Sequence, residues 1–125
     1  MEAIDLRLAV LCVRADGILE IRFKPGLLTD AAGVQEVVEG RRRLCEGAPR
    51  RVMVVLAEDV DFELEVTTTD NAPQVADRTV AEATVATTTL NNKVASMYYR
   101  YIHHPYPTSV HVSEDSAVEW LLQQT

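Results

Sequence analysis

Apolar and polar residues in the first part of the chain follow a pattern that predicts two β-strands. Residues 6–13 are apolar almost throughout, whereas residues 18–24 alternate between apolar and charged side chains. Asp16 and Gly17 lie between the two stretches, and an Asp-Gly pair supplies the positive φ that a tight hairpin turn requires. We therefore expect an antiparallel hairpin near the start of the chain.

A helix is predicted after this hairpin. Thr29 or Asp30 can cap its start, and apolar residues recur at helical spacing until about Glu46. Three consecutive arginines at positions 41–43 occupy its last turn, where positive charge is favoured by the helix dipole. We interpret the three arginines as a solvent-exposed helix end, and an anion site is the less favoured alternative.

Residues 51–57 contain a short, unbroken apolar run that is rich in β-branched side chains, which indicates a parallel strand covered on both faces. We expect this strand to be the centre of the sheet. The acidic residues Asp59, Asp61, Glu63 and Glu65 follow it directly. They would lie at the carboxyl end of a parallel strand, where ligands of open α/β sheets tend to bind.

Helices and strands are expected to alternate through the rest of the chain. Thr67, Thr68 and Thr69 disfavour a helix, and the proline at position 73 suits a helix that begins nearby. The expected elements are irregular chain before Asn71, a helix from about residue 71 to residue 80, a strand at 82–87, a helix after Thr88, a loop at 103–107, a strand at 109–112 and a helix after Ser113. In the helix after Thr88, a stripe of Leu90, Val94, Met97 and Tyr101 is expected to face the core.

The element order ββαβαβαβα predicts an α/β fold with a mixed sheet, in which an N-terminal antiparallel hairpin precedes parallel strands joined by right-handed helical crossovers. The chain has 125 residues, of which 47% are hydrophobic. This length and composition suffice for one core, and we expect a single domain over residues 1–125.

Charge and composition argue against several classes of partner. The chain has 12 basic and 19 acidic residues, for a net charge of −7, which disfavours nucleic acid. No apolar run is long enough to cross a bilayer, and the first residues are acidic where a signal peptide is basic. We expect a cytoplasmic protein without membrane insertion.

Several short signatures together resemble small bacterial STAS-like proteins, which share the fold of anti-sigma factor antagonists. They are the hairpin with its Asp-Gly turn, the Lys24-Pro25-Gly26 exit, the apolar strand at 52–56, the Leu90-Asn91-Asn92-Lys93 segment, the loop at 105–108 and the final segment at 117–121. Anti-sigma factor antagonists act by binding other proteins. The resemblance therefore implies a STAS-like sheet and a regulatory, protein-binding role.

The phosphorylation switch of anti-sigma factor antagonists is not carried over to this chain. In that family a serine in an Asp-Ser-x-Gly turn follows the central strand, whereas the equivalent stretch here, residues 60–64, contains no serine. Thr67 is a weak substitute, and a structural role in a polar loop or cap is the favoured interpretation of its hydroxyl.

Catalytic chemistry is not expected. The carboxylates of Asp59, Asp61 and Glu63 would need a companion nucleophile or histidine, and a solvated acidic loop is the favoured interpretation. The histidines at positions 103, 104 and 111 lack the spacing of a metal site. Phosphate-binding glycine motifs are absent from the sequence. We expect no enzyme, no metal and no cofactor.

The best candidate for a contact surface is a group of tyrosines near the third predicted helix. Tyr98, Tyr99, Arg100 and Tyr106 are expected to form an interaction surface together with the acidic loop, because tyrosine gives a large contact area at little entropic cost. We expect a non-enzymatic interaction or regulatory module that self-associates as a dimer or binds another protein. The alternative is a small-molecule or lipid-binding domain with a pocket between sheet and helices.

Overall fold

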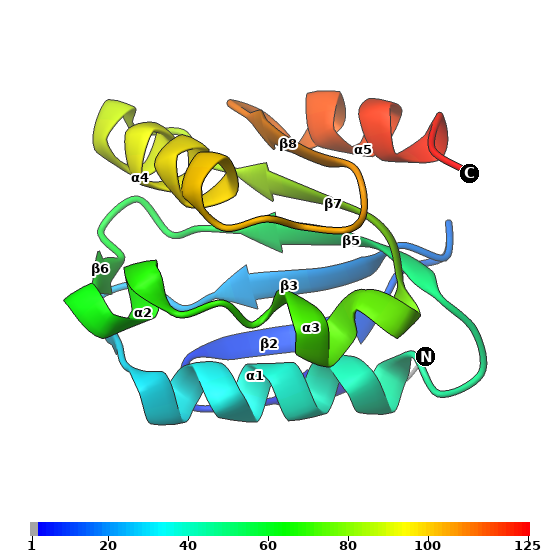
Figure 1. Cartoon of the computed structure of the whole chain (residues 1–125), viewed down its shortest axis with the longest axis horizontal. Coiled ribbons are helices and arrows are strands. Elements are labelled where there is room, and N and C mark those ends of the chain that lie inside the picture. The colour runs from blue at the N-terminus through cyan, green and yellow to red at the C-terminus, as the bar shows by residue number, and fades with distance from the viewer. Residues whose placement is uncertain (1–2) are drawn as a thin grey trace.

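The computed structural model describes residues 3–125 and contains a mixed sheet that follows the predicted order from antiparallel to parallel strands (Figure 1). In these residues the main sheet has six strands. Their spatial order is β1 (Ala3–Asp5), β2 (Ala9–Val13), β3 (Leu19–Phe23), β5 (Arg50–Val55), β7 (Thr79–Val85) and β8 (Thr108–His111). The first three strands pair antiparallel, and β3, β5, β7 and β8 pair parallel. The predicted hairpin and central strand are thus confirmed.

Two short strands and five helices complete the described chain. The short strands β4 (Leu28–Thr29) and β6 (Asp61–Phe62) pair with each other. The helices are α1 (Ala31–Leu44), α2 (Leu64–Thr68), α3 (Ala72–Val75), α4 (Thr89–Tyr101) and α5 (Glu114–Leu122), and a 3₁₀ turn follows α3 at Ala76–Arg78.

The starts of the longer helices follow the predicted capping chemistry. The side chains of Asp30, Thr88 and Ser113 each accept a hydrogen bond from a backbone N–H three residues later. In the hairpin, Gly17 adopts a φ of 85°, the left-handed conformation that the predicted turn requires. These local signals fix where α1, α4 and α5 begin.

The sheet separates two hydrophobic clusters because successive residues of a strand point to opposite faces. Val52 packs in the cluster beneath α1, whereas the adjacent Met53 packs in the cluster beneath α5, and both side chains are fully buried. On β7, Ala81 and Ala83 lie in the α5 cluster, and the intervening Glu82 points to the opposite face. The face with Glu82 is covered by α1 to α4 (Figure 1).

Several predicted boundaries are wrong. The strand predicted at 82–87 occupies Thr79–Val85, and the helix predicted to reach residue 80 ends at Val75. The sequence pattern also missed β1, β4 and β6. The threonine segment expected to be irregular is largely helical in α2, where the threonine hydroxyls donate to the carbonyls of Leu64 and Glu65. None of the helices in residues 3–125 combines the length and the apolarity needed to cross a bilayer.

The predicted core stripe of α4 is wrong for three of its four residues. Leu90, Met97 and Tyr101 are 70%, 55% and 72% exposed, and the buried residues of α4 are instead Asn91 and Ala95. Asn91 donates two side-chain hydrogen bonds to the carbonyls of Ala57 and Glu58, at 3.0 and 3.3 Å. Leu90, Met97 and Tyr101 therefore face outward, whereas Val94, the fourth residue of the stripe, is half-buried. A polar side chain, that of Asn91, attaches α4 to the loop that follows β5.

Candidate functional site

A cavity of about 180 Å³ lies between the sheet and the helices α1 to α4. Its floor is formed by the inward-facing side chains of β3, β5 and β7, and its walls by the four helices and the loop that follows α4. The apolar lining is contributed by Ile21 and Phe23 of β3, Val54 and Leu56 at the end of β5, Val34, Val37 and Val38 of α1, and Ala72 and Val75 of α3. The cavity thus occupies the space that a continuous core would fill.

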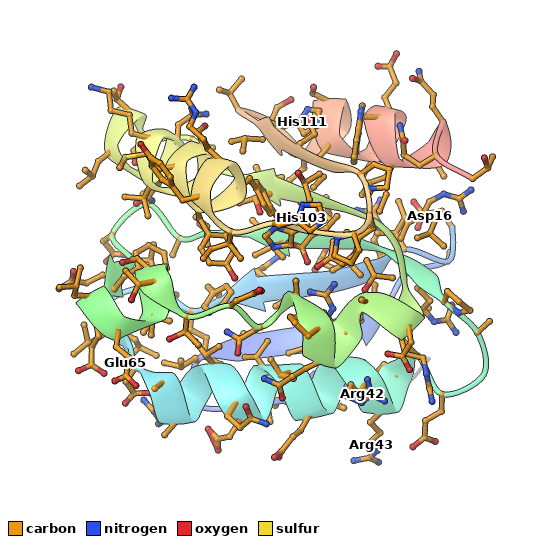
Figure 2. All side chains as sticks on the ribbon, viewed as in Figure 1. Asp16, Arg42, Arg43, Glu65, His103 and His111 are labelled. Carbon is orange, nitrogen blue, oxygen red and sulfur yellow. The ribbon has the colours of Figure 1, made fainter. Side chains whose placement is uncertain are left out.

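A buried ion pair contributes the charged part of the lining. Nη1 of Arg41 on α1 donates to Oε1 of Glu82 on β7 at 2.6 Å, and Nη2 donates to the hydroxyl of Thr79 at 2.9 Å. The side chains of Arg41 and Glu82 are 9% and 8% exposed. The prediction of a solvent-exposed arginine cluster is therefore wrong for Arg41, whereas Arg42 and Arg43 lie at the end of α1 next to it (Figure 2).

Two hydroxyl groups extend this network. The Tyr99 hydroxyl donates to Oε2 of Glu82 at 2.6 Å and lies 2.6 Å from the hydroxyl of Thr84. A carboxylate can only accept, so the single proton of Tyr99 points to Glu82 and Thr84 donates to Tyr99. Both oxygens of Glu82 are consequently engaged, one by Arg41 and one by Tyr99.

The pair stays ionised despite its burial. Burial by itself would raise the pKa of Glu82, but the Arg41 guanidinium and the Tyr99 hydroxyl outweigh it and hold the pKa below its usual value. Burial also acts to lower the pKa of Arg41, and Glu82 and Tyr106 reverse that effect, so the pKa lies above its usual value. Together the two charges cancel at the cavity wall.

Aromatic rings form the wall next to the ion pair. The ring of His104 makes edge contacts with the rings of Tyr98, Tyr99 and Tyr106 at centroid distances of 5.4, 5.1 and 5.5 Å. Nδ1 of His104 lies 2.8 Å from the carbonyl of Ile102, so this nitrogen carries the proton. Burial raises the pKa of Tyr98 to about 12, and it also raises the pKa of Tyr99 and that of Tyr106 above the usual value. All three hydroxyls are protonated at neutral pH.

Two polar atoms of the cavity lining are buried without a hydrogen-bond partner in the described chain. They are the hydroxyl of Thr29, whose residue is 1% exposed, and Nε of Arg41. Buried polar groups are nearly always paired in native proteins, and each exception calls for an explanation. Both atoms belong to residues that line the cavity, whereas the third such atom in residues 3–125, Nε2 of His111, lies outside it.

The structure divides the predicted site residues between the cavity and the surface. Tyr98, Tyr99 and Tyr106 line the cavity, and Tyr106 is only 9% exposed, so the prediction that Tyr99 and Tyr106 form an outer surface is corrected. Arg100 is exposed on α4. Thr67 also lines the cavity, and its hydroxyl donates to the carbonyl of Leu64 at 2.8 Å.

The acidic loop is separate from the cavity lining. Asp59, Asp61 and Glu63 are all exposed, and Asp61 accepts a hydrogen bond from the backbone N–H of Phe62. Figure 2 shows the neighbouring Glu65 on α2, and His103 and His111 on different elements. Within residues 3–125, no three acidic, histidine or cysteine side chains gather closely enough to hold a metal ion.

Sequence reasoning missed the polar centre of the cavity, namely Arg41, Glu82, Thr84 and Thr29. One signal for it exists in β7. Glu82 and Thr84 point to one face of β7, whereas Ala81, Ala83 and Val85 point to the other face. Buried polar side chains on one face need a polar partner or a ligand. The sequence alone does not identify Arg41 as that partner.

Comparison with known proteins identifies a family and a distant structural similarity. The model of the family described as "Domain of unknown function (DUF7793)" matches residues 11–125. No curated protein matches the chain. A crystal structure of a protein with unknown function from Arthrobacter sp. FB24 is similar at 19% sequence identity and a TM-score of 0.31, over 89% of this chain and 90% of that chain.

Proposed function

We propose a binding function for this chain, which belongs to the DUF7793 family: it holds a small, mostly apolar molecule in the cavity between the sheet and α1 to α4. The observation that carries the proposal is the cavity itself, where apolar walls surround a few convergent polar groups. This combination is typical of ligand sites. The proposal takes up the small-molecule alternative from the sequence, because Tyr99 and Tyr106 face inward.

The volume supports a small ligand. An engineered cavity of roughly 150 Å³ with apolar walls binds benzene, and the cavity here measures about 180 Å³. A ligand of that size would remove the apolar lining from water, which favours binding.

The polar groups support binding in preference to catalysis. Glu82 is ionised and already accepts from Arg41 and Tyr99, and the tyrosine hydroxyls have raised pKa values. A general acid or base works best with a pKa near the working pH. The pKa of Glu82 lies below neutral pH, and the pKa values of the tyrosine hydroxyls lie above it. We therefore propose that the chain acts without catalysing a reaction.

The first test fills the cavity from the helix side. Ala95 of α4 is 7% exposed and lines the cavity, whereas the adjacent Ser96 is exposed. We expect toluene and acetophenone to raise the melting temperature of the wild type in a dose-dependent manner. Ala95→Leu should weaken binding at least about tenfold, and Ser96→Leu should not change it. If neither compound stabilises the wild type, or if both variants bind equally well, the proposed function is wrong.

A second candidate function is self-association through a groove between α2 and α4. Leu64, Met97 and Tyr101 line this groove and are 80%, 55% and 72% exposed. The α2 side carries Glu63 and Glu65 next to the groove, and the α4 side carries Lys93 and Arg100. No ion pair joins these charges within residues 3–125. In a twofold dimer, α4 of one copy would face α2 of the other and bring opposite charges together.

Self-association is tested by the molar mass in solution. We expect a dimer in sedimentation equilibrium, and Leu64→Glu should raise the dimer dissociation constant more than about tenfold because it places a charge in the apolar groove. Leu122 on α5 is 50% exposed, and Leu122→Glu is the matched control that should leave the dimer intact. A wild type that stays monomeric at millimolar concentration would exclude this function.

A further inference from the structure

We propose that the ligand carries an uncharged hydrogen-bond acceptor, such as a ketone or amide oxygen, that binds Nε of Arg41. This inference rests on the proposed binding function and names the chemical class of the molecule. It follows from which of the Arg41 donors are already used and from the balance of charge around them.

One of the three guanidinium nitrogens of Arg41 has no hydrogen-bond partner in residues 3–125. Nη1 donates to Glu82 and Nη2 donates to Thr79, whereas Nε is buried without a partner in the described chain. Arg41 lines the cavity, and its side chain is 9% exposed. An arginine has donors and no acceptor, so the atom that completes its hydrogen bonding must be an acceptor.

Charge balance excludes an anion as the best ligand. Arg41 and Glu82 form a closed pair at 2.6 Å, so the wall of the cavity is neutral overall. A carboxylate or phosphate would bring a second negative charge into a buried site whose only positive charge in the lining is already neutralised. A neutral oxygen accepts from Nε without that penalty.

The surrounding rings favour a flat molecule at this end of the cavity. Tyr99, His104 and Tyr106 line the cavity, and Glu82, the partner of Arg41, accepts from Tyr99. The hydroxyl of Thr29, the second unpartnered polar atom of the lining, belongs to β4, which precedes α1, whereas Arg41 lies in the last turn of that helix. The aromatic wall places the molecule near Arg41.

Three compounds of nearly the same shape test the inference: acetophenone, α-methylstyrene and benzoate. They present a ketone oxygen, a hydrocarbon and a carboxylate at the same position. By titration calorimetry at pH 7 we expect acetophenone to bind about tenfold more tightly than α-methylstyrene, and benzoate to bind most weakly. Arg41→Lys keeps a positive charge beside Glu82 but removes Nε, and should reduce the acetophenone affinity to that of α-methylstyrene. Arg42→Lys is the matched control outside the cavity.

The outcomes separate this inference from the function on which it rests. If acetophenone and α-methylstyrene bind equally well, the cavity binds ligands and the role of Nε is wrong. If benzoate binds most tightly, the site takes anions and the charge argument fails. If none of the three binds, the proposed function itself is wrong. The comparison of ligands on the wild type decides between these outcomes even where Arg41→Lys does not fold.

Discussion

Replacing Arg41 with methionine is expected to lower the free energy of unfolding by about 3–5 kcal/mol. The substitution leaves the carboxylate of Glu82 buried, with its side chain 8% exposed, and without its counter-charge. Small domains are stable by only about 5–15 kcal/mol, so this variant would be close to unfolding. Urea denaturation followed by circular dichroism measures the loss.

Two further variants show whether the loss comes from the unpaired charge. Arg42, the next residue, forms an ion pair with Asp77 in which the side chains are 39% and 60% exposed, and Arg42→Met should cost less than about 1 kcal/mol. The double variant Arg41→Met, Glu82→Leu removes both charges and should recover most of the stability. A loss of under about 1 kcal/mol for Arg41→Met would contradict the buried pair.

The effect of pH on Arg41→Met has a definite sign. In the wild type the pKa of Glu82 is below its ordinary value of 4.5, so the pair stabilises the fold above that pH, and this contribution is lost as the pH falls through the lowered pKa. Without Arg41, burial raises the pKa of Glu82, and the penalty is present at neutral pH and disappears as the carboxyl becomes protonated. The stability difference between the two proteins should therefore narrow from about pH 7 to about pH 4.

Local signals in the sequence were sufficient for the elements that depend on neighbouring residues. The Asp16-Gly17 turn, the Asp30 and Thr88 caps and the apolar run of β5 each act within a few positions, and the structure confirms them. The irregular segment between β5 and β7 was harder to predict. There the hydroxyls of Thr67 and Thr69 donate hydrogen bonds to backbone carbonyls of the short helix α2. This helix forms although threonine has a low helix propensity.

The cavity could not be predicted from the sequence, because its polar centre is formed by residues that are far apart in the chain. Arg41 and Glu82 are brought together by the crossover from α1 through β5 to β7, and an arginine in the last turn of a helix is usually solvated. The stripe on α4 shows the same limit. Periodicity identified Leu90 and Met97 as one face, but it did not show which environment this face meets.

Met53→Ala is expected to cost about 2–5 kcal/mol, which is the second large effect. Met53 lies at the centre of the sheet, on β5 between β3 and β7, and is fully buried in the cluster beneath α5. Truncating it removes contacts and leaves a cavity that the surrounding strands cannot close. Because this cluster lies on the face opposite the ligand cavity, the affinity for acetophenone measured on the folded fraction should stay within about twofold.

The same substitution at Met97 is the matched control. Met97 belongs to the stripe that the sequence placed in the core, but it is 55% exposed, so Met97→Ala should change the free energy of unfolding by less than about 0.5 kcal/mol. The pair of variants compares the two faces of the fold by one chemical change, measured by urea denaturation. Equal losses of unfolding free energy at the two positions would mean that α4 packs Met97 inward. The placement of Ala95 and Tyr99 in the cavity wall would then be wrong.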